Sequence, residues 1–260
     1  MDRRIFIQLA TAAAGVALCG GARANEVLRA AYEDSEQPPY YMGTGPDPDP
    51  SLPGVSVEML REAGREAGID IQFTRMPWVR CQKSLERGEV DLIFNASFKP
   101  DRMKLGVYPM VDGKPDPARR IDTIAYALYR PKGGAAAFDG KTVTGLDGGP
   151  VAAPAGYSIL GDLKAMGVAT ETAPDTVTNF RKLASGRIPA TAALERIGDG
   201  LLADFPQIEK VTPLLATKDY FVMASHQSFE TRRATIERLW AKLAEVRDGA
   251  GSRIYARYAK

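Results

Sequence analysis

Apolar strands alternate with amphipathic helices along most of this 260-residue chain, and this alternation constrains the fold more than any other feature. Residues 27–32 predict a strand, 54–67 a helix, 69–75 a strand, and 77–85 a helix that ends at Gly88. Such repetition indicates a mixed, mainly parallel sheet flanked by helices. We therefore expect an α/β protein.

A second unit of the same kind follows a strand at 123–129. Its expected strands are 150–153, 168–172 and 188–194, and its expected helices are 158–166, 175–184 and one starting at Glu195. Two such units in one chain predict two lobes. The chain then returns through a strand at 219–225 to amphipathic helices at 229–246 and 252–258.

Residues 1–24 have the pattern of an export signal. The basic pair Arg3-Arg4 precedes a short apolar run, and small residues precede a cleavage site that we place after Ala24. The run is too short to span a membrane. The two arginines resemble the twin-arginine signal, although the Sec route also fits. Leu18 is too large for a lipoprotein site at Cys19, so we expect a soluble periplasmic monomer.

Charge and cysteine content exclude several classes of partner. Removing Arg3, Arg4, Arg23 and Asp2 from the 34 basic and 32 acidic residues leaves 31 of each. A net charge of zero argues against a nucleic-acid partner and implies no membrane-surface partner. Cys81 would then be the remaining cysteine, so no internal disulfide is expected.

The stretch 88–102 is the strongest candidate for a binding element. It predicts a short apolar strand, a turn that carries Asn95 and Ser97, and a new helix begun at Pro100 and Asp101. A hydroxyl, the Arg102 guanidinium and free backbone N–H groups would then meet at a strand's carboxyl end, where open α/β sheets hold ligands. We expect an anion there; the alternative is Arg102 as a solvated cap residue.

A proline-rich loop at 38–50 lies between the first predicted strand and helix. Proline stiffens it into extended segments, and long loops in compact domains are often binding elements.

Several segments resemble family 3 of the bacterial extracellular solute-binding proteins, the periplasmic receptors of polar amino-acid ABC importers. The matching segments in the first half are Leu28-Arg29-Ala30-Ala31, Pro39-Tyr40, Gly54 to Leu60, Pro77-Trp78-Val79-Arg80, Gly88 to Leu92 and Asp101-Arg102. In the second half, Gly156-Tyr157-Ser158 resembles the glycine-hydroxyl turn of the family, and Tyr220 to Ala224 resembles its returning strand.

This resemblance implies a type II periplasmic-binding-protein fold with crossover strands near 125–129 and 220–224. Lobe 1 would comprise residues 25–126 plus 222–260, and lobe 2 residues 127–221. Hinge closure would capture a small carboxylate-bearing solute, such as an amino acid, for delivery to the membrane subunits of an ABC importer. No cofactor or metal is implied.

The resemblance also assigns roles in the site. Arg102 would clamp the ligand carboxylate with help from the Ser97 hydroxyl, a task that suits a planar guanidinium. Asn95 would lie beside them. Gly156 to Ser158 would add backbone N–H donors from the other lobe.

The remaining candidates concern specificity. Glu195 is the nearest carboxylate to the family's ammonium-binding aspartate, and it is equally well explained as a first-turn helix residue. Tyr40, Trp78 and Tyr157 are the expected aromatic walls, with core packing as the alternative for Trp78. Glu33 or Asp34, just past the first strand, could meet an ammonium group, and Arg80 could meet a second acid group, although a solvated loop position also explains each of these three residues.

Enzymatic readings find little support in the sequence. His226 is the single histidine, no serine or cysteine has a recognisable base partner, and no cluster has metal-ligand spacing. Two alternatives stay open. One is a dehydratase or lyase on the same fold with Glu33 or Glu195 as proton carrier, and the other is an accessory protein that docks on a periplasmic redox enzyme or sensor.

Overall fold

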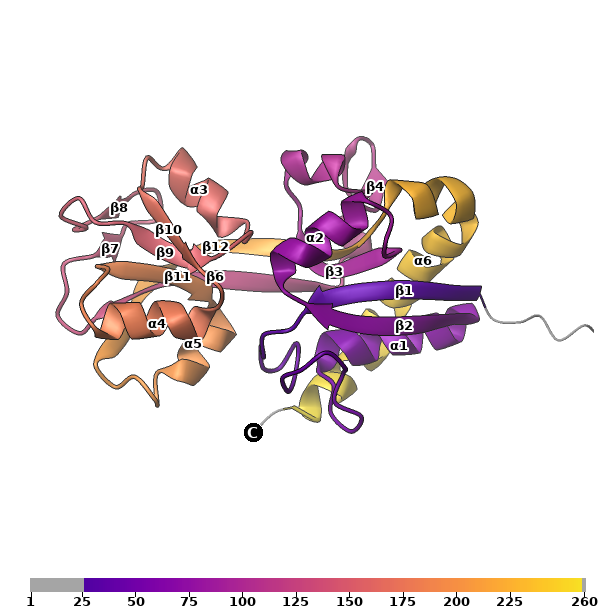
Figure 1. The fold of residues 1–260 in the computed structure, drawn as a ribbon, viewed down its shortest axis with the longest axis horizontal. Coiled ribbons are helices and arrows are strands. Elements are labelled where there is room, and N and C mark those ends of the chain that lie inside the picture. The colour runs from indigo at the N-terminus through magenta and orange to yellow at the C-terminus, as the bar shows by residue number, and fades with distance from the viewer. Residues whose placement is uncertain (1–25, 259–260) are drawn as a thin grey trace, which may run out of the picture.

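The computed structural model describes residues 26–258 and shows two lobes side by side, joined by two long strands (Figure 1). One mixed eight-stranded sheet runs through both lobes. In spatial order its strands are β10 (Thr170–Ala173), β9 (Val151–Pro154), β11 (Ala190–Leu194), β6 (Asp122–Pro131), β12 (Ile208–Ala224), β3 (Leu92–Ser97), β1 (Glu26–Glu33) and β2 (Ile69–Met76). The expected two-lobed α/β fold is confirmed.

Helices cover the sheet in both lobes. They are α1 (Val55–Ala67), α2 (Trp78–Glu86), α3 (Ile159–Ala165), α4 (Thr176–Ala184), α5 (Glu195–Leu201) and α6 (His226–Ala256). The helices α1, α2 and α6 belong to lobe 1, and α3, α4 and α5 belong to lobe 2 (Figure 1).

Lobe 1 is organised by the alternation of side chains along β1, which pairs in parallel with β2 and β3. Leu28 and Tyr32 join the cluster that contains residues of α1 and α6. The intervening Ala31 joins a second cluster with Cys81 of α2. Because successive side chains in a strand point to opposite faces, one apolar strand binds a helix layer on each side.

Lobe 2 repeats this arrangement around β9 and β11, which are parallel to each other. Ala152 and Ala193 pack with Phe180 of α4, while Ala153 and Ala192 belong to the large cluster on the other face. Small side chains on these strands let the helices approach the sheet closely.

The strands β6 and β12 cross between the lobes as an antiparallel pair (Figure 1). Asp122 pairs with Tyr220 in register, and the register shifts between Val211 and Ala216. The expected crossover strands are therefore present. The lobe boundaries at residues 126/127 and 221/222 stay a prediction, since both strands run continuously through them.

Two expectations about local structure were wrong. The segment after Ser97 forms a 3-10 turn, η1 (Pro100–Lys104), instead of an α-helix. The two C-terminal helices are one helix, α6, whose non-helical residue is Arg232.

Short elements in the loops were not anticipated. They are the hairpins β4 (Met110–Val111) with β5 (Lys114–Pro115) and β7 (Ala137–Phe138) with β8 (Val143–Thr144), and the 3-10 turn η2 (Pro117–Arg119).

Cys81 is buried and free. Burial raises the pKa of its thiol. The expected export signal, with its cleavage site after Ala24, lies outside the described residues. Within residues 26–258, no helix combines the length and the apolar character needed to cross a bilayer.

Candidate functional site

The carboxyl ends of the strands in both lobes point toward the gap between the lobes. In lobe 1, the parallel strands β1 and β3 end at Glu33 and Ser97, and Trp78 follows β2. In lobe 2, β9 and β11 end at Pro154 and Leu194. Ligands of open α/β sheets bind outside the carboxyl ends of the strands, so the topology itself selects this gap as the candidate site.

A small inner cavity lies in this gap, with a volume of about 20 Å³. Its lining joins both lobes and both crossover strands. The lining residues are Glu33, Gln37, Tyr41, Trp78, Asn95, Ser97, Arg102, Ile124, Tyr126, Tyr157, Ser158, Leu194 and Tyr220. Seven of the predicted site residues are therefore brought together: Glu33, Trp78, Asn95, Ser97, Arg102, Tyr157 and Ser158.

Arg102 is 6% exposed and reaches both lobes. Its Nη1 donates to the backbone oxygen and the hydroxyl of Ser97, at 2.8 and 3.2 Å, and its Nη2 donates to the backbone oxygen of Gly156 at 2.8 Å. The guanidinium carbon lies 5.6 Å from the ring centre of Trp78. Among residues 26–258, no carboxylate lies within 4.0 Å of Arg102, so its buried charge has only neutral partners.

The turn at Gly156 contributes a hydrogen-bond acceptor to the site, whereas backbone N–H donors were expected. Its carbonyl oxygen accepts hydrogen bonds from Arg102 and, at 3.3 Å, from the indole of Trp78. The α3 helix that follows is a single short helix of seven residues. The turn thus presents a carbonyl oxygen to the Arg102 side, where the resemblance implied N–H donors.

Glu33 is the second buried charge of the cavity, 5% exposed. Its Oε2 accepts a hydrogen bond of 2.8 Å from the Tyr157 hydroxyl, which in turn accepts one of 2.7 Å from Gln37 Nε2. Burial raises the pKa of Glu33 to about 7, against the opposing effect of the hydrogen bonds from Tyr157 and Gln37. A carboxyl group with such a pKa can gain or lose its proton near neutral pH.

Hydroxyl groups line the rest of the contact between the lobes. The Ser97 hydroxyl donates to the Ser158 hydroxyl at 2.8 Å, and Lys99 Nζ donates to the Ser158 carbonyl at 3.4 Å. Burial lowers the pKa of Lys99.

Asn95 adopts a left-handed backbone conformation with φ 53°, which asparagine tolerates better than most residues. Its Nδ2 donates to the Ser56 hydroxyl at 2.9 Å. Its Oδ1 is buried at the cavity and has no hydrogen-bond partner among residues 26–258. This oxygen is available as an acceptor.

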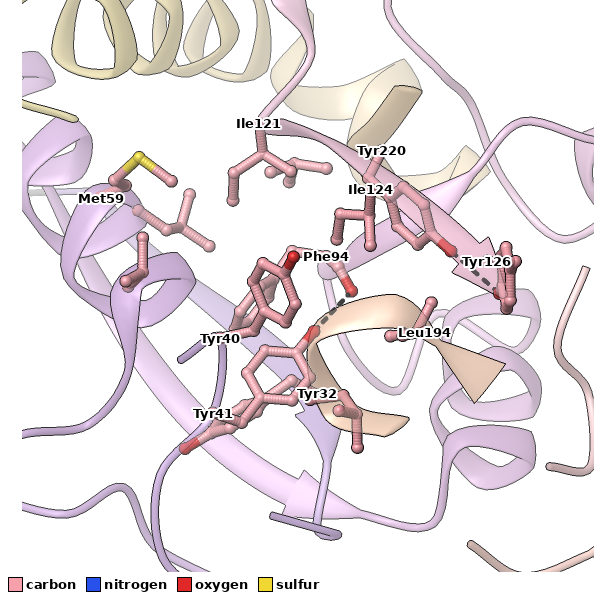
Figure 2. Close-up of a cluster of buried hydrophobic side chains, with 14 of the residues drawn as sticks. Tyr32, Tyr40, Tyr41, Met59, Phe94, Ile121, Ile124, Tyr126, Leu194 and Tyr220 are labelled. Carbon is pink, nitrogen blue, oxygen red and sulfur yellow. Dashed lines mark hydrogen bonds between the residues drawn. The ribbon is translucent and has the colours of Figure 1, made fainter. Parts of the chain in front are cut away.

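The crossover strands supply cavity residues that the sequence analysis did not identify. Tyr220 donates to the Tyr126 hydroxyl at 2.9 Å, and Figure 2 shows this pair together with Leu194 and the Tyr41 side chain. Burial raises the pKa of both paired tyrosines. The sequence did contain a signal for these two residues, because Tyr126 and Tyr220 are aromatic side chains with a hydroxyl group on the predicted crossover strands.

Three predicted site residues lie away from the inner cavity. Tyr40 is buried in the hydrophobic core, and its neighbour Tyr41 lines the cavity instead. Arg80 is exposed on α2. Glu195 starts α5 and forms an ion pair with Lys210 at 2.9 Å, as its alternative explanation implied.

An outer cavity of about 640 Å³ adjoins the inner one. Glu33, Gln37 and Tyr157 line both cavities. The outer cavity also has carboxylates on both lobes, from Asp34, Glu36 and Asp175, and the guanidinium groups of Arg181 and Arg196. Within the described part of the chain, no group of three or more His, Cys, Asp or Glu side chains is arranged to hold a metal ion.

Comparisons with known proteins agree with this architecture. The sequence model of the bacterial extracellular solute-binding proteins, family 3, matches residues 28–106. No curated protein sequence matches the chain.

Solved structures of similar fold include an ancestral arginine-binding protein bound to glutamine, with TM-score 0.68, 17% identity, and coverage of 89% of this chain and 97% of that one. A Salmonella typhimurium periplasmic binding protein with high arginine specificity has TM-score 0.69, 12% identity, and coverage of 90% and 100%. A histidine kinase sensor domain with similarity to periplasmic binding proteins has TM-score 0.66, 19% identity, and coverage of 91% and 96%.

The fold and its interlobe cleft define a protein with the two-lobed architecture of periplasmic binding proteins. The particular resemblance is confirmed as well. Residues 28–106 match the sequence model of the family 3 solute-binding proteins, and the similar solved structures share the fold of both lobes.

Proposed function

We propose that this protein captures a small carboxylate-bearing solute between its lobes and delivers it to an ABC importer by hinge closure. An amino acid or a related polar compound is the expected solute class. The proposed location is the periplasm, and the proposed state is a monomer without cofactor or catalytic activity.

One observation carries the proposal. Arg102 is buried at the strand ends, borders the cavity, and has no carboxylate partner among residues 26–258. An unpaired buried charge is costly, and a carboxylate that binds two guanidinium N–H groups compensates it well. Glu33 and the free Oδ1 of Asn95 are acceptors for a donor group on the same solute.

The comparisons support this class of function. The similar structures include one described as the substrate binding protein of an amino acid ABC transporter, with TM-score 0.67 and 12% identity. Two of the other similar structures are described as arginine-binding proteins. Amino acids are therefore the first solutes to test.

The decisive test replaces Arg102. The solute is first identified by mass spectrometry of protein purified gently, and its affinity is then measured by calorimetry for Arg102→Ala and Arg102→Lys. Breaking a buried charge pair typically costs ~2–5 kcal/mol, so Arg102→Ala should weaken binding by well over an order of magnitude. Lysine keeps the charge but loses the two-pronged geometry, so Arg102→Lys should also bind poorly.

Two controls make this test specific. Arg80→Ala removes an exposed arginine outside the cavity lining and should bind like the wild type. The stability of Arg102→Ala without solute should change little, because Tyr108 still donates to the Ser97 carbonyl and Trp78 to the Gly156 carbonyl. Near-wild-type affinity of Arg102→Ala would refute the anchor role.

A receptor that signals without transport is a second candidate, because one of the similar structures is a histidine kinase sensor domain. Co-purification with a membrane sensor or a redox enzyme in place of importer subunits would favour it. Conversion of the bound solute to a product would favour the enzyme alternative, with Glu33 as the carboxylate that faces the cavity.

A further inference from the structure

The Tyr157 hydroxyl joins the two lobes at the boundary between the inner and outer cavities. Tyr157 belongs to lobe 2, whereas its partners Glu33 and Gln37 belong to lobe 1. All three residues line both cavities. The side chain therefore separates two spaces that lie along one cleft.

The space around Arg102 is too small for the proposed solute while Tyr157 keeps this position. A cavity of about 20 Å³ has room for about one water molecule, whereas sites for small molecules typically measure roughly 300–1,000 Å³. The outer cavity, at about 640 Å³, falls in that range. A solute that enters from the outer cavity meets Tyr157 before it meets Arg102.

We infer that Tyr157 is a latch: its hydroxyl holds the lobes together through Glu33 and Gln37, and a solute reaches Arg102 only after this hydroxyl has left them. This inference rests on the proposed function and adds a gate to it. Tyr157 would then compete with the solute, where the family resemblance implied an aromatic wall.

The latch also restricts the chemistry of the solute. Glu33 is buried, and a buried carboxyl group that loses its donor is destabilised until another donor replaces it. A solute that binds Arg102 and keeps the latch released must therefore offer a hydrogen-bond donor to Glu33. The class is a carboxylate that carries an ammonium, amide, guanidinium or hydroxyl group at a distance from the carboxyl end.

Trp78 provides a signal for release of the latch. It is 7% exposed, and its indole donates to Gly156 across the gap. The chain has two tryptophans, and the other, Trp240, is 1% exposed in the core of lobe 1. Separation of the lobes exposes Trp78 and leaves Trp240 covered.

The first experiment needs no solute. Acrylamide quenching of tryptophan fluorescence is compared for the wild type, Tyr157→Phe, Tyr157→Ala and the control Tyr129→Phe. The control hydroxyl bonds Asp199 and the Glu195 carbonyl within lobe 2. Losing the two hydrogen bonds of Tyr157 should raise the ratio of open to closed lobes roughly 5- to 30-fold, and so raise quenching, while Tyr129→Phe should leave quenching unchanged.

Equal quenching in the wild type and both Tyr157 variants, with unchanged circular dichroism, would overturn the latch. A second arm titrates L-glutamine and L-arginine as probes. Tyr157→Phe should bind at least one of them more tightly than the wild type, and equal or weaker binding would overturn the competition between Tyr157 and solute. If no variant binds either probe, that result counts against the proposed solute class, and quenching alone decides the latch.

Discussion

The two lobes differ in the kind of polar group that they bury. Among residues 26–258, the buried charged side chains are Glu33, Arg75, Asp91 and Arg102, and all of them lie in lobe 1. The buried polar side chains of lobe 2 are uncharged: Ser158, Thr176, Asn179 and Thr191. The buried charges of the described residues therefore lie in lobe 1, where Glu33 and Arg102 line the inner cavity, and lobe 2 faces that cavity with uncharged side chains.

The largest expected effect concerns the charged framework of lobe 1. Asp91 accepts hydrogen bonds from Arg29, Ser228 and Arg232, which ties β1, β3 and the kink of α6 together. Asp91→Ala leaves the Ser228 hydroxyl and the Arg29 backbone N–H without their charged acceptor and breaks the ion pairs with Arg29 and Arg232, so it should destabilise the protein by about 3 kcal/mol in urea unfolding.

The matched control is Glu171→Ala in lobe 2, which removes a partly exposed ion pair with Lys182 and should cost less than about 1 kcal/mol.

Burial tends to raise the pKa of Asp91, but the hydrogen bonds from Arg29 and Ser228 and the charge of Arg232 outweigh it and lower this pKa to about 2. The stabilisation should therefore be complete above about pH 4 and be lost as the pH falls toward 2. Equal losses of stability for Asp91→Ala and Glu171→Ala would contradict the difference between the two lobes.

The second prediction concerns the pH dependence that Glu33 gives to the closed lobes. Its pKa of about 7 lies above the ordinary value, so the closed protein binds the proton more tightly than an open or unfolded chain. The stabilisation is fully present below about pH 4.5 and is lost as the pH rises through about 7. The rise of this pKa from 4.5 to about 7 corresponds to about 3.5 kcal/mol at 1.4 kcal/mol per unit.

Glu33→Gln should flatten this pH profile, which unfolding curves or Trp78 quenching between pH 4 and 8 would measure. The nearby carboxylates Asp34 and Asp175 raise the pKa of Glu33 further, so neutralising either should weaken the dependence. An unchanged slope in Glu33→Gln would assign the dependence to another group.

The smallest effect is expected from packing in lobe 2. Gly198 of α5 lies against the ring of Tyr129, and a methyl group there would overlap the ring. Gly198→Ala should destabilise the protein by about 1–3 kcal/mol. On the same helix, Gly200 has open space around it, so Gly200→Ala should be neutral or gain up to about 1 kcal/mol. Thermal unfolding of both variants would measure the difference.

The sequence predicted the fold and one half of the site for the same physical reason. Ser97 ends β3, and Trp78 and Arg102 lie shortly after the ends of β2 and β3; parallel strands place their carboxyl ends at one edge of a sheet. Periodicity and chain order sufficed to place Ser97 and Arg102 together. Trp78 and the segment Gly156 to Ser158 were assigned to the site by the family resemblance.

The other site residues depended on the directions of side chains, which local sequence patterns do not determine. Tyr40 and Tyr41 are neighbours in an irregular loop, and only the folded loop decides which of them turns to the cavity. Glu195 forms an ion pair with Lys210, a residue of β12 that is placed there by the long-range pairing of β12 with β6. The prediction that Arg80 lies at the site could have been avoided. Two residues after Trp78 the helix has turned by roughly 200°, which directs Arg80 away from the cavity.

The double crossing between the lobes has a consequence for the order of folding during synthesis. The predicted lobe 2, residues 127–221, is one uninterrupted segment, whereas lobe 1 also needs the end of β12 and the helix α6, which are synthesised after lobe 2. Until then, the apolar faces of β1, β3 and α1 lack the helix that covers them. Domains generally fold as units when their chain is complete. The lobe that begins second is therefore the first whose elements are all synthesised, and it can fold before α6 of the other lobe has been made.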